Sequence, residues 1–567
     1  MLPFKKEIAA RLASLTGMAA EEVETCLEIP PDPALGEYAF PCYPLARRLK
    51  KSPQAIAAEL AGRMAPSEHL ERVENAGPYL NFYVQRSYLF QKLLPQILQE
   101  GPSYGTLNEG EGRTVLVDYS APNIAKPFSV GHLRSTVIGN ALCRLYRACG
   151  YKVVGINHLG DWGTQFGKLI VAYRRWGEAA RLAGDPVHYL YHLYVRFHQE
   201  AENEPELEEE ARQWFRRLEK GDREARELWE RFRDLSLENF QRLYHYLGIS
   251  FDSYMGESDY NDRLEATIEL ARRRGLIKES EGALVADLEP YGLPLCLLRK
   301  KDGAALYITR DLAAAIYRHE TYSFDRMLYV VGAEQTLHFQ QFFKMLALLG
   351  FDWAGNCVHV PFGLIHFKDG RMSTRQGNVI FLEEVLKRAV ELAREIIEEK
   401  NPSLQEKDHV ARAVGLGAVI FGDLINDRIK DVEFDWEKVL DFAGETAPYI
   451  QYSHARICSI LRRAASETGS SGTTAATLLH EPEEEALIVA MAHFSEEISR
   501  AVRDNRPSYV ARYLLELARG FNKFYHNCPV LTAEKELREG RLMLVAAVRI
   551  VLRNGLALLG IEAPQEM

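Results

Sequence analysis

A strand–helix–strand pattern between residues 114 and 154 constrains the fold of this chain more than any other feature. Val115–Val117 is a short apolar run that predicts a buried strand, and apolar residues then recur at helical spacing from 133 to 145. Gly150 is placed to end that helix, and residues 153–154 begin a second strand. Two strands joined by a helix form a βαβ unit, which implies a parallel sheet.

The same alternation returns later in the chain. We expect two further helices, at 312–319 and 337–349, and strands at 305–308, 327–331 and 357–361. The intervening residues, about 172–285, have the charge pattern of helices, and a solvated helical insertion is favoured over a dedicated RNA-binding arm. The central part is therefore predicted to be an α/β domain with a helical insertion.

The sequence on either side has a different character. The N-terminal residues predict a small α+β domain with a strand at 79–84, and the pattern beyond residue 382 is helical except for a Ser/Thr/Gly-rich loop at 466–477. The predicted fold class is multidomain α/β: a Rossmann-like parallel-sheet domain between a small α+β domain and an all-α bundle. The predicted domain limits are 1–108, 109–384 and 385–567.

Composition narrows the class of protein. Over 567 residues, 69 Lys and Arg stand against 79 Asp and Glu, a formal net charge of −10 that argues weakly against indiscriminate nucleic-acid binding. The charged N-terminus and the lack of an apolar run of about 18 residues predict a cytoplasmic protein with no membrane partner. The eight cysteines form no CxxC pair, so neither a disulfide framework nor a zinc site is expected.

The first βα connection, Asp118–Arg134, lies beyond the carboxyl end of a strand, where open α/β sheets bind ligands. Gly131 permits a close approach to a helix N-terminus, whose N–H groups favour an anion. His132 adds a donor for a phosphate and Lys126 a positive charge. The loop has neither GxGxxG nor GxxxxGKS/T, so it is not a dinucleotide fingerprint or a P-loop. Taken alone, His132 fits a helix-capping role better.

A second polar loop, Arg371–Asn378, follows the last predicted strand. It holds two cations, two hydroxyls and a glycine, a composition that suits closure over a polyphosphate. By itself this loop would fit a solvated surface turn better.

Together, the two loops and their order resemble a class I aminoacyl-tRNA synthetase, in which the HIGH and KMSKS motifs occupy these places. The finer resemblance is to the arginyl-tRNA synthetase family, and it covers nearly the whole chain. It implies a class I catalytic domain, a tRNA-contacting N-terminal domain and a helical anticodon-binding domain in a monomer. The motifs that carry it are Ser120–Lys126, Gly131–Thr136, His158–Gly167, Tyr307–Asp311, Phe434–Trp436, Tyr449–Ile457 and Gly560–Pro564.

The resemblance implies ATP-dependent attachment of L-arginine to tRNA(Arg) through an arginyl-adenylate, with release of pyrophosphate and AMP. Mg²⁺ would arrive with ATP, held by phosphates rather than by a protein metal site. Ser129 replaces the first histidine of HIGH and Thr374 the second lysine of KMSKS, and we hypothesise that Lys126 supplies the missing charge. The implied catalytic residues are Lys126, Ser129, His132, Arg371, Ser373 and Arg375. The implied ATP contacts are Lys126, Ser129, Gly131, His132 and Met372.

Arginine presents a planar cationic fork that carboxylates bind in bidentate geometry. By the resemblance, Asp118, Tyr307 and Asp311 face the guanidinium, and Asn123 and Gln335 hold the α-amino end. Asp311 taken singly would suit a helix cap better. Further residues expected to line the cleft are His158, Asp161 and Gln165.

The residues expected to contact tRNA lie at the two ends of the chain. The resemblance gives the basic patch of Arg47, Arg48, Lys50 and Lys51 a contact with the outer corner of tRNA, and a solvated helix face is the alternative. Stacking on anticodon bases is expected of Tyr449, Tyr452 and Arg456, although tyrosines three residues apart could equally belong to a core.

Two other functions stay open at this level. A catalytically silent RNA-binding relative is supported only by Ser129, and the complete arginine-binding set argues against it. A small-molecule nucleotidyltransferase also uses a Gly-His loop on such a sheet, but it has no need of a long helical tail.

Overall fold

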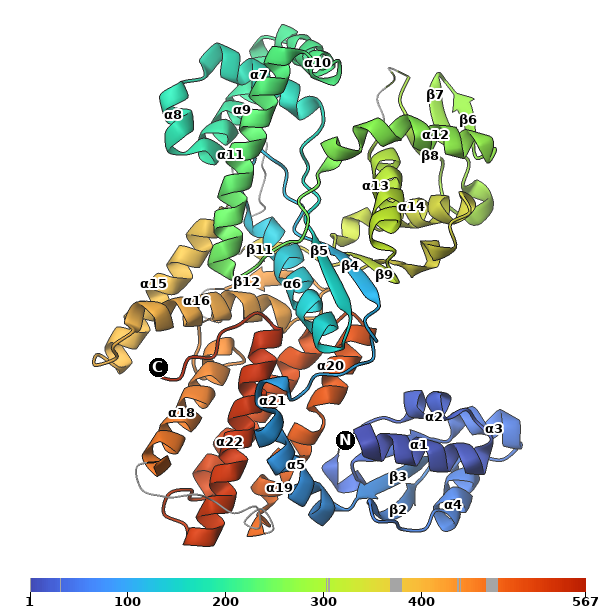
Figure 1. Ribbon diagram of the computed structural model, residues 1–567, viewed down its shortest axis with the longest axis vertical. Coiled ribbons are helices and arrows are strands. Elements are labelled where there is room, and N and C mark those ends of the chain that lie inside the picture. Colours follow the sequence, from blue (N-terminus) through green and yellow to red (C-terminus); the bar gives the residue numbers. More distant parts are fainter. Residues whose placement is uncertain are drawn as a thin grey trace.

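The computed structural model describes residues 2–30, 32–301, 303, 306–367, 380–435, 438, 440–465 and 478–567. A four-stranded parallel sheet lies at its centre, between the insertion and the C-terminal helices (Figure 1). The strand order is β10-β9-β4-β5. The strands are β4 (Thr114–Asp118), β5 (Lys152–Ile156), β9 (Arg326–Tyr329) and β10 (Cys357–His359). The parallel sheet predicted from the sequence is thereby confirmed.

Helix α6 (Leu133–Ala148) joins β4 to β5, α13 (Tyr307–Tyr322) precedes β9, and α14 (Thr336–Leu348) joins β9 to β10. The predicted strand at 305–308 is wrong, because Tyr307 begins α13 instead. Residue 305 lies outside the described residues, and the Leu306 N–H donates to the Leu298 carbonyl, which holds the chain beside a neighbouring strand as the helix starts. Periodicity cannot distinguish such a short apolar run from the first turn of a buried helix.

The region between the two halves of the sheet is helical up to residue 247. Its helices are α7 (Thr164–Trp176), α8 (Ala179–Gly184), α9 (Pro186–Asn203), α10 (Glu206–Glu219) and α11 (Arg223–Leu247). The chain continues through a 3₁₀ turn at Glu257–Arg263, then α12 (Leu264–Arg273) and an antiparallel sheet of β6 (Ile277–Ser280), β7 (Ala283–Ala286) and β8 (Cys296–Arg299).

The prediction of helices throughout 172–285 is therefore wrong at β6 and β7. These strands turn on Glu281 and Gly282, both of which have positive φ, 52° and 80°. Such a two-residue hairpin turn is usually signalled by Asn or Asp before Gly, and glutamate gives no such signal.

The N-terminal region forms the predicted small α+β domain, with an antiparallel sheet of order β1-β3-β2. The strand predicted at 79–84 is β3 (Tyr79–Val84). The other elements are α1 (Leu2–Thr16), α2 (Ala20–Cys26), β1 (Tyr38–Pro41), α3 (Tyr43–Leu49), α4 (Pro53–Arg63) and β2 (Leu70–Ala76). Helix α5 (Arg86–Glu100) leaves this sheet and packs against two C-terminal helices, α19 (Pro482–Ala492) and α22 (Lys535–Leu558) (Figure 1). The predicted domain limits themselves stay a prediction.

The C-terminal part is helical with one exception. Strand β12 (Val432–Phe434) pairs in parallel with β11 (Ile365–Phe367), so the prediction of helix throughout is wrong there. The predicted loop at 466–477 lies outside the described residues. The remaining helices are α15 (Leu382–Lys400), α16 (Lys407–Leu424), α18 (Ala447–Ala465), α20 (Phe494–Arg503) and α21 (Ser508–Asn527). Short 3₁₀ turns elsewhere are Pro33–Leu35, Gly101–Ser103, Val130–His132, Glu289–Tyr291, Ala333–Gln335 and Asp352–Asn356.

Among the helices of the described residues, none combines the length and the apolar character needed to cross a membrane.

Candidate active site

The loop after β4 is held in an unusual backbone conformation by hydroxyl groups. Ser120, Ala121 and Ala125 have φ of 71°, 41° and 58°, values that residues other than glycine rarely adopt. The Ser120 N–H donates to Ser135 Oγ on α6 at 2.9 Å, and the Ala125 N–H donates to Ser236 Oγ on α11 at 2.9 Å. The sheet domain and the insertion thus fix this loop together, and such strain is typical of a preorganised site.

His132 in this loop is a neutral hydrogen-bond donor. The Ser129 N–H donates to His132 Nδ1 at 3.1 Å, and Ser129 Oγ lies 3.1 Å from the same nitrogen. Burial, with a smaller contribution from the charge of Lys126, lowers the pKa of His132 to about 4. Because Nδ1 accepts, the proton of the neutral ring lies on Nε2. The capping role is therefore present, and it leaves an N–H group to donate to a phosphate.

The rest of this loop offers a positively charged side chain, Lys126, and an exposed backbone at Gly131. Lys126 Nζ lies 5.4 Å from the centre of the Tyr194 ring, which belongs to α9 of the insertion. Gly131 is exposed, and a Cβ added there would meet Ser129 Oγ at 3.3 Å. The helix α6 begins two residues later, so its free N–H groups face the same region.

The segment that begins at Ile380, after the second predicted loop, lies beside Ser129. The Val130 N–H donates to the Ile380 carbonyl at 3.2 Å, and the Leu382 N–H donates to the Phe128 carbonyl at 2.9 Å. The segment that follows the loop is thus paired with the Gly-His loop. The predicted residues Arg371, Met372, Ser373, Thr374 and Arg375 lie outside the described residues.

Asp118 ends β4 and is paired within the chain. It is buried, and its Oδ2 accepts a hydrogen bond from Arg318 Nη1 at 2.8 Å. Burial lowers the pKa of the Arg318 guanidinium, but the charge and hydrogen bond of Asp118, together with Tyr260 and Tyr329, raise it above its usual value. A substrate guanidinium at Asp118 would therefore share this carboxylate with Arg318.

The other predicted arginine contacts lie around the start of α13. Asp311 lies one turn inside α13 rather than at its cap, and its Oδ2 is 2.7 Å from His338 Nε2. Tyr307 is 67% exposed, which leaves its ring open to a ligand. Gln335 is also exposed, at the end of a 3₁₀ turn. Burial and the Cys357 thiol raise the pKa of Tyr329, and the charges of Asp118 and Asp311 add to the rise.

The remaining predicted residues line the β5 side. His158 Nδ1 is 3.2 Å from the Met255 carbonyl, and Asp161 is buried and accepts from Ser258 Oγ at 2.6 Å. Asn123 lies against Gly160, where an added Cβ would meet Asn123 Oδ1 at 2.3 Å, so glycine is needed for this approach. Gln165 is half-buried in the first turn of α7.

The sequence reasoning missed Glu257. Burial raises its pKa to about 8, Arg310 opposes the rise, and the charges of Asp311 and Asp161 add to it. The charge of Glu257 in turn raises the pKa of Tyr307, after burial. The Glu257 N–H donates to the Leu159 carbonyl at 3.0 Å, which anchors the residue beside the β5 loop. Glu257, Asp161 and Asp311, the carboxylate cluster of this site, therefore stand near enough for the charges of Asp161 and Asp311 to act on Glu257, although they do not converge as metal ligands do.

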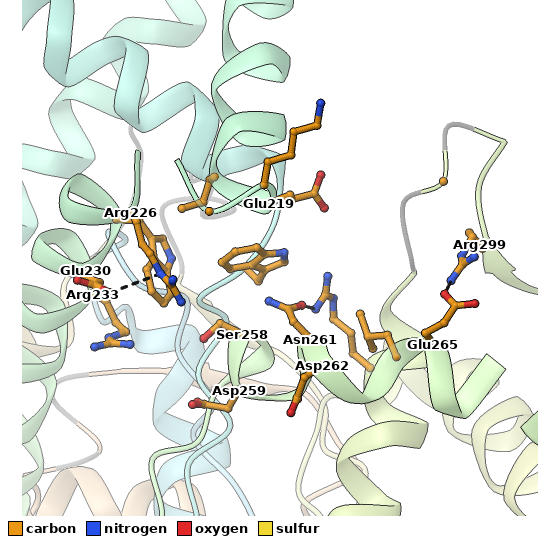
Figure 2. A pocket seen from close by; sticks show the side chains of 18 residues that line it. Glu219, Arg226, Glu230, Arg233, Ser258, Asp259, Asn261, Asp262, Glu265 and Arg299 are labelled. Carbon is orange, nitrogen blue, oxygen red and sulfur yellow. Dashed lines mark hydrogen bonds and ion pairs between the residues drawn. The ribbon is translucent and has the colours of Figure 1, made fainter. Parts of the chain in front are cut away.

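A cavity of about 770 Å³ opens next to this cluster, between the insertion and the 3₁₀ turn Glu257–Arg263 (Figure 2). Trp162 and Trp229 line it with ring centroids 5.5 Å apart. Figure 2 shows Arg226 and Arg233 at the insertion wall. The lining carries both signs of charge, since it also holds Glu219, Glu230, Asp259, Asp262 and Glu265. Trp229 is buried, and its ring N–H donates to the Asp161 carbonyl.

The predicted tRNA-binding residues of the N-terminal domain are exposed, but some are engaged. Arg47, Arg48 and Lys50 are all exposed on or just after α3. Arg48 Nη2 donates to the Gly17 carbonyl at 2.7 Å, and Lys51 Nζ forms an ion pair with Glu59 at 2.5 Å. Two of the four basic side chains, Arg48 and Lys51, are thus engaged within the chain.

In the C-terminal bundle, Tyr449 and Tyr452 differ. Tyr449 is half-buried and its hydroxyl accepts from Asn522 Nδ2 at 3.0 Å. Tyr452 is 42% exposed, stacks under the Arg456 guanidinium at 4.8 Å and lines a cavity of about 600 Å³. Tyr449 is thus tied to the core, whereas Tyr452 is open to a base.

In the part of the chain that the structure describes, no three His, Cys, Asp or Glu side chains gather as a group that could hold a metal ion.

Comparison with known proteins agrees with this geometry. Three family descriptions match: "Arginyl tRNA synthetase N terminal domain" over residues 3–84, "tRNA synthetases class I (R), catalytic domain" over 93–436 and "DALR anticodon binding domain" over 450–567. The chain is 48% identical to an arginine–tRNA ligase of Clostridioides difficile and 47% identical to one of Halothermothrix orenii, each over the full length of both chains.

Solved structures agree as well. The arginyl-tRNA synthetase of Thermus thermophilus is 30% identical, with a TM-score of 0.85 over 99% of each chain. That of Plasmodium falciparum, at 22% identity and a TM-score of 0.81 over 99% of each chain, shares the fold. The sheet with its Gly-His loop, the helical C-terminal part and these full-length matches lead to one conclusion: the chain belongs to the arginyl-tRNA synthetase family of class I aminoacyl-tRNA synthetases.

Proposed function

We propose that the chain attaches L-arginine to tRNA(Arg) at the expense of ATP, with ATP at the Gly-His loop and arginine at the neighbouring carboxylates. The observation that carries this proposal is the carboxylate cluster of Glu257, Asp161 and Asp311 beside Tyr307. A carboxyl with a pKa raised to about 8 by burial and by like charges gains most from a bound cation. A guanidinium is the cation whose planar fork matches carboxylates.

The same geometry supports the roles expected of the other residues. Asp118, Tyr307 and Asp311 would face the guanidinium, and Asn123 and Gln335 would hold the α-amino end. The arginine carboxylate would then point toward the Gly-His loop, which is continuous with β4. This arrangement places the nucleophile of the first step beside the ATP site without any base, because a carboxylate is already ionised.

In the first step, an oxygen of that carboxylate attacks the α-phosphorus, and the bond to the pyrophosphate oxygen breaks. Negative charge shifts to the leaving pyrophosphate, so donors aimed at phosphate oxygens lower the barrier. His132 would donate from Nε2, Lys126 would supply a full charge, and the N-terminus of α6 would add free N–H groups. Ser129 would orient the His132 ring through these two contacts. It would not supply the positive charge of the histidine that it replaces in the HIGH motif.

Mg²⁺ enters this proposal as part of the ATP substrate. The described residues near the Gly-His loop offer nitrogen and hydroxyl donors rather than a set of carboxylates, which fits an ion held mainly by phosphate oxygens. When bound, the ion would neutralise charge on the β- and γ-phosphates.

The second step needs the 3′ end of tRNA beside the adenylate. The cavity lined by Trp162, Arg226 and Arg233 adjoins the carboxylate cluster, and its guanidinium groups would meet the phosphates of unpaired nucleotides, while its acidic side chains would face away from them. Arg47, Arg48 and Lys50 would meet the outer corner of the tRNA, and Tyr449, Tyr452 and Arg456 the anticodon. Tyr452 is the strongest of these three, because it is exposed at a cavity. The cytoplasmic location and the monomeric state stay predictions.

Arginine-dependent exchange of pyrophosphate into ATP, with and without tRNA(Arg), tests the proposed function. We expect exchange with arginine and tRNA present, and none with citrulline, whose neutral side chain leaves the carboxylates unpaired. Lack of exchange under either condition, with tRNA still bound, would instead support the silent RNA-binding relative.

Replacement of Lys126 by alanine tests the assignment of charge in the Gly-His loop. We expect adenylate formation to slow on the order of 10²-fold, because a cation near the α-phosphate is lost. Lys152→Ala is the matched control, since this lysine is exposed at the opposite end of β5. Adenylate formation within about threefold of the wild-type rate in Lys126→Ala would refute the role of Lys126.

A further inference from the structure

Arg134 lies in the first turn of α6, directly after the Gly-His loop, and contacts neither of the two proposed substrates. Its side chain is 1% exposed. Its Nε donates to Asp423 Oδ1 at 2.7 Å, and its Nη1 donates to the carbonyls of Gly363 at 2.9 Å and Lys430 at 2.7 Å. One buried guanidinium thus holds three acceptors.

These acceptors come from parts of the chain far from α6 in sequence. Asp423 lies near the end of α16, Gly363 precedes β11 and Lys430 precedes β12 (Figure 1). The parallel pairing of β11 with β12 joins two of them directly. Arg134 therefore connects the start of α6 to the beginning of the helical C-terminal part.

A second arginine holds the same segment from the other side. Arg428 Nη1 donates to the Pro361 carbonyl at 2.6 Å, and its Nε donates to the Asn505 carbonyl between α20 and α21 at 3.0 Å. Asn505 Oδ1 accepts from Tyr146 of α6 at 2.8 Å. Both ends of α6 are thus linked to the C-terminal helices through hydrogen bonds made by buried or half-buried side chains.

The chemistry of Arg134 requires arginine at this position. Three acceptors at fixed directions match the rigid fork of a guanidinium, whereas the compact ammonium of lysine presents its donors from one atom. Burial raises the pKa of Asp423, and the charge of Arg134 and its hydrogen bond oppose that rise. A bridge of this kind holds its partners in a defined register as well as adding stability.

We propose that Arg134 is a positioning residue for ATP binding. Its bridge to Asp423, Gly363 and Lys430 holds the first turn of α6, and with it Ser129, Gly131 and His132, at a defined place against the C-terminal part of the chain. The proposal rests on the proposed ATP site at the Gly-His loop. It predicts that loosening the bridge weakens ATP binding more than arginine binding.

The protein offers a matched control in Arg541. This buried arginine makes a similar bridge inside the C-terminal bundle, from Nε to Glu484 Oε1 at 2.7 Å and from Nη1 to the Pro529 carbonyl at 2.7 Å. Arg541→Lys therefore loosens a bridge of the same kind between elements that do not include the Gly-His loop. This variant therefore shows how far a loss of stability by itself changes ATP affinity.

The test measures ATP affinity by calorimetry, melting temperature, and separate KM values for ATP and arginine in exchange. For Arg134→Lys, we expect ATP affinity to fall about 10-fold and KM for arginine to change less than about twofold. For Arg541→Lys, we expect a similar fall in melting temperature with ATP affinity within about twofold. Equal ATP affinities in the two variants would overturn the proposal and leave Arg134 a structural residue.

A double variant covers the case in which Arg134→Lys folds poorly. Arg134→Met with Asp423→Leu removes both charges, and apolar replacement of a buried pair often preserves stability. We expect this variant to melt above Arg134→Met alone, because no buried charge is left unpaired, and below the wild type, because the Gly363 and Lys430 carbonyls lose a donor. It should still bind ATP about 10-fold more weakly than the wild type. Recovery of ATP affinity would overturn the proposal. Because ATP binding is measured without arginine, its outcome is separate from the arginine-dependent exchange that tests the proposed function.

Discussion

Replacement of Glu257 by glutamine is expected to raise the KM for arginine on the order of 10²-fold, with the KM for ATP changed less than about twofold. The carboxyl lies close enough to Asp161 and Asp311 for their charges to raise its pKa, and it acts on Tyr307 in the same way. Glutamine keeps the shape but loses the charge that pairs with a guanidinium. A charge-assisted hydrogen bond in a desolvated site is worth more than a neutral one.

Asp262→Asn is the matched control for this variant. Asp262 lies on the same 3₁₀ turn and is exposed, so its charge is screened by water. Steady-state exchange kinetics with arginine varied at saturating ATP measure both variants. A KM for arginine in Glu257→Gln equal to that of Asp262→Asn would contradict the role of Glu257.

The pH dependence of kcat/KM for arginine tests the role of Glu257 in a second, independent way. The pKa of Glu257 is about 8 in the protein, so the carboxyl is protonated below that pH and ionised above it. Arginine binds the ionised form, and kcat/KM for arginine should therefore rise as the pH rises through about 8 and then level off. Glu257→Gln should remove this rise. The same shift makes the folded state bind the extra proton, so Glu257 lowers stability as the pH increases from about 4.5 to about 8.

The sequence was sufficient for the parts of the site that lie on one continuous segment. Lys126, Ser129 and His132 stand between an apolar strand and a periodic helix, and that order alone places them at the edge of a parallel sheet. Glu257 could not be found in this way. It stands near Asp259 and Asp262 in a polar stretch, and only the fold half-buries Glu257 while the other two carboxyls stay exposed.

The sequence also could not show which residues pair with the site residues from distant parts of the chain. Asp118 was predicted to face a substrate guanidinium, and in the structure it is the last residue of β4. The structure adds Arg318, 200 positions later, as a partner inside the chain. Arg318 stands in the last turns of α13, where a single sequence gives no reason to expect a buried charge. Arg134 was likewise part of a recognised motif without an assigned contact.

Replacement of Arg318 by methionine is expected to lower the free energy of unfolding by about 3–5 kcal/mol, because it leaves the Asp118 carboxylate buried without its cation. Arg318 is 2% exposed and pairs with Asp118 Oδ2 at 2.8 Å. Denaturant unfolding, read as a change in midpoint at constant slope, measures the loss. A loss below about 1 kcal/mol would mean that the carboxylate finds water or another donor, as exposed pairs do.

The double variant Arg318→Met with Asp118→Leu separates the structural part of this pair from its part in catalysis. Removal of both charges should restore most of the stability, since well-packed apolar side chains replace a buried pair at little cost. Arginine activation should not recover with it, because the proposed guanidinium contact at Asp118 is gone. If KM for arginine returned to the wild-type value in the stable double variant, Asp118 would serve only to hold α13 against β4. Arginine recognition would then rest on the Glu257, Asp161 and Asp311 cluster alone.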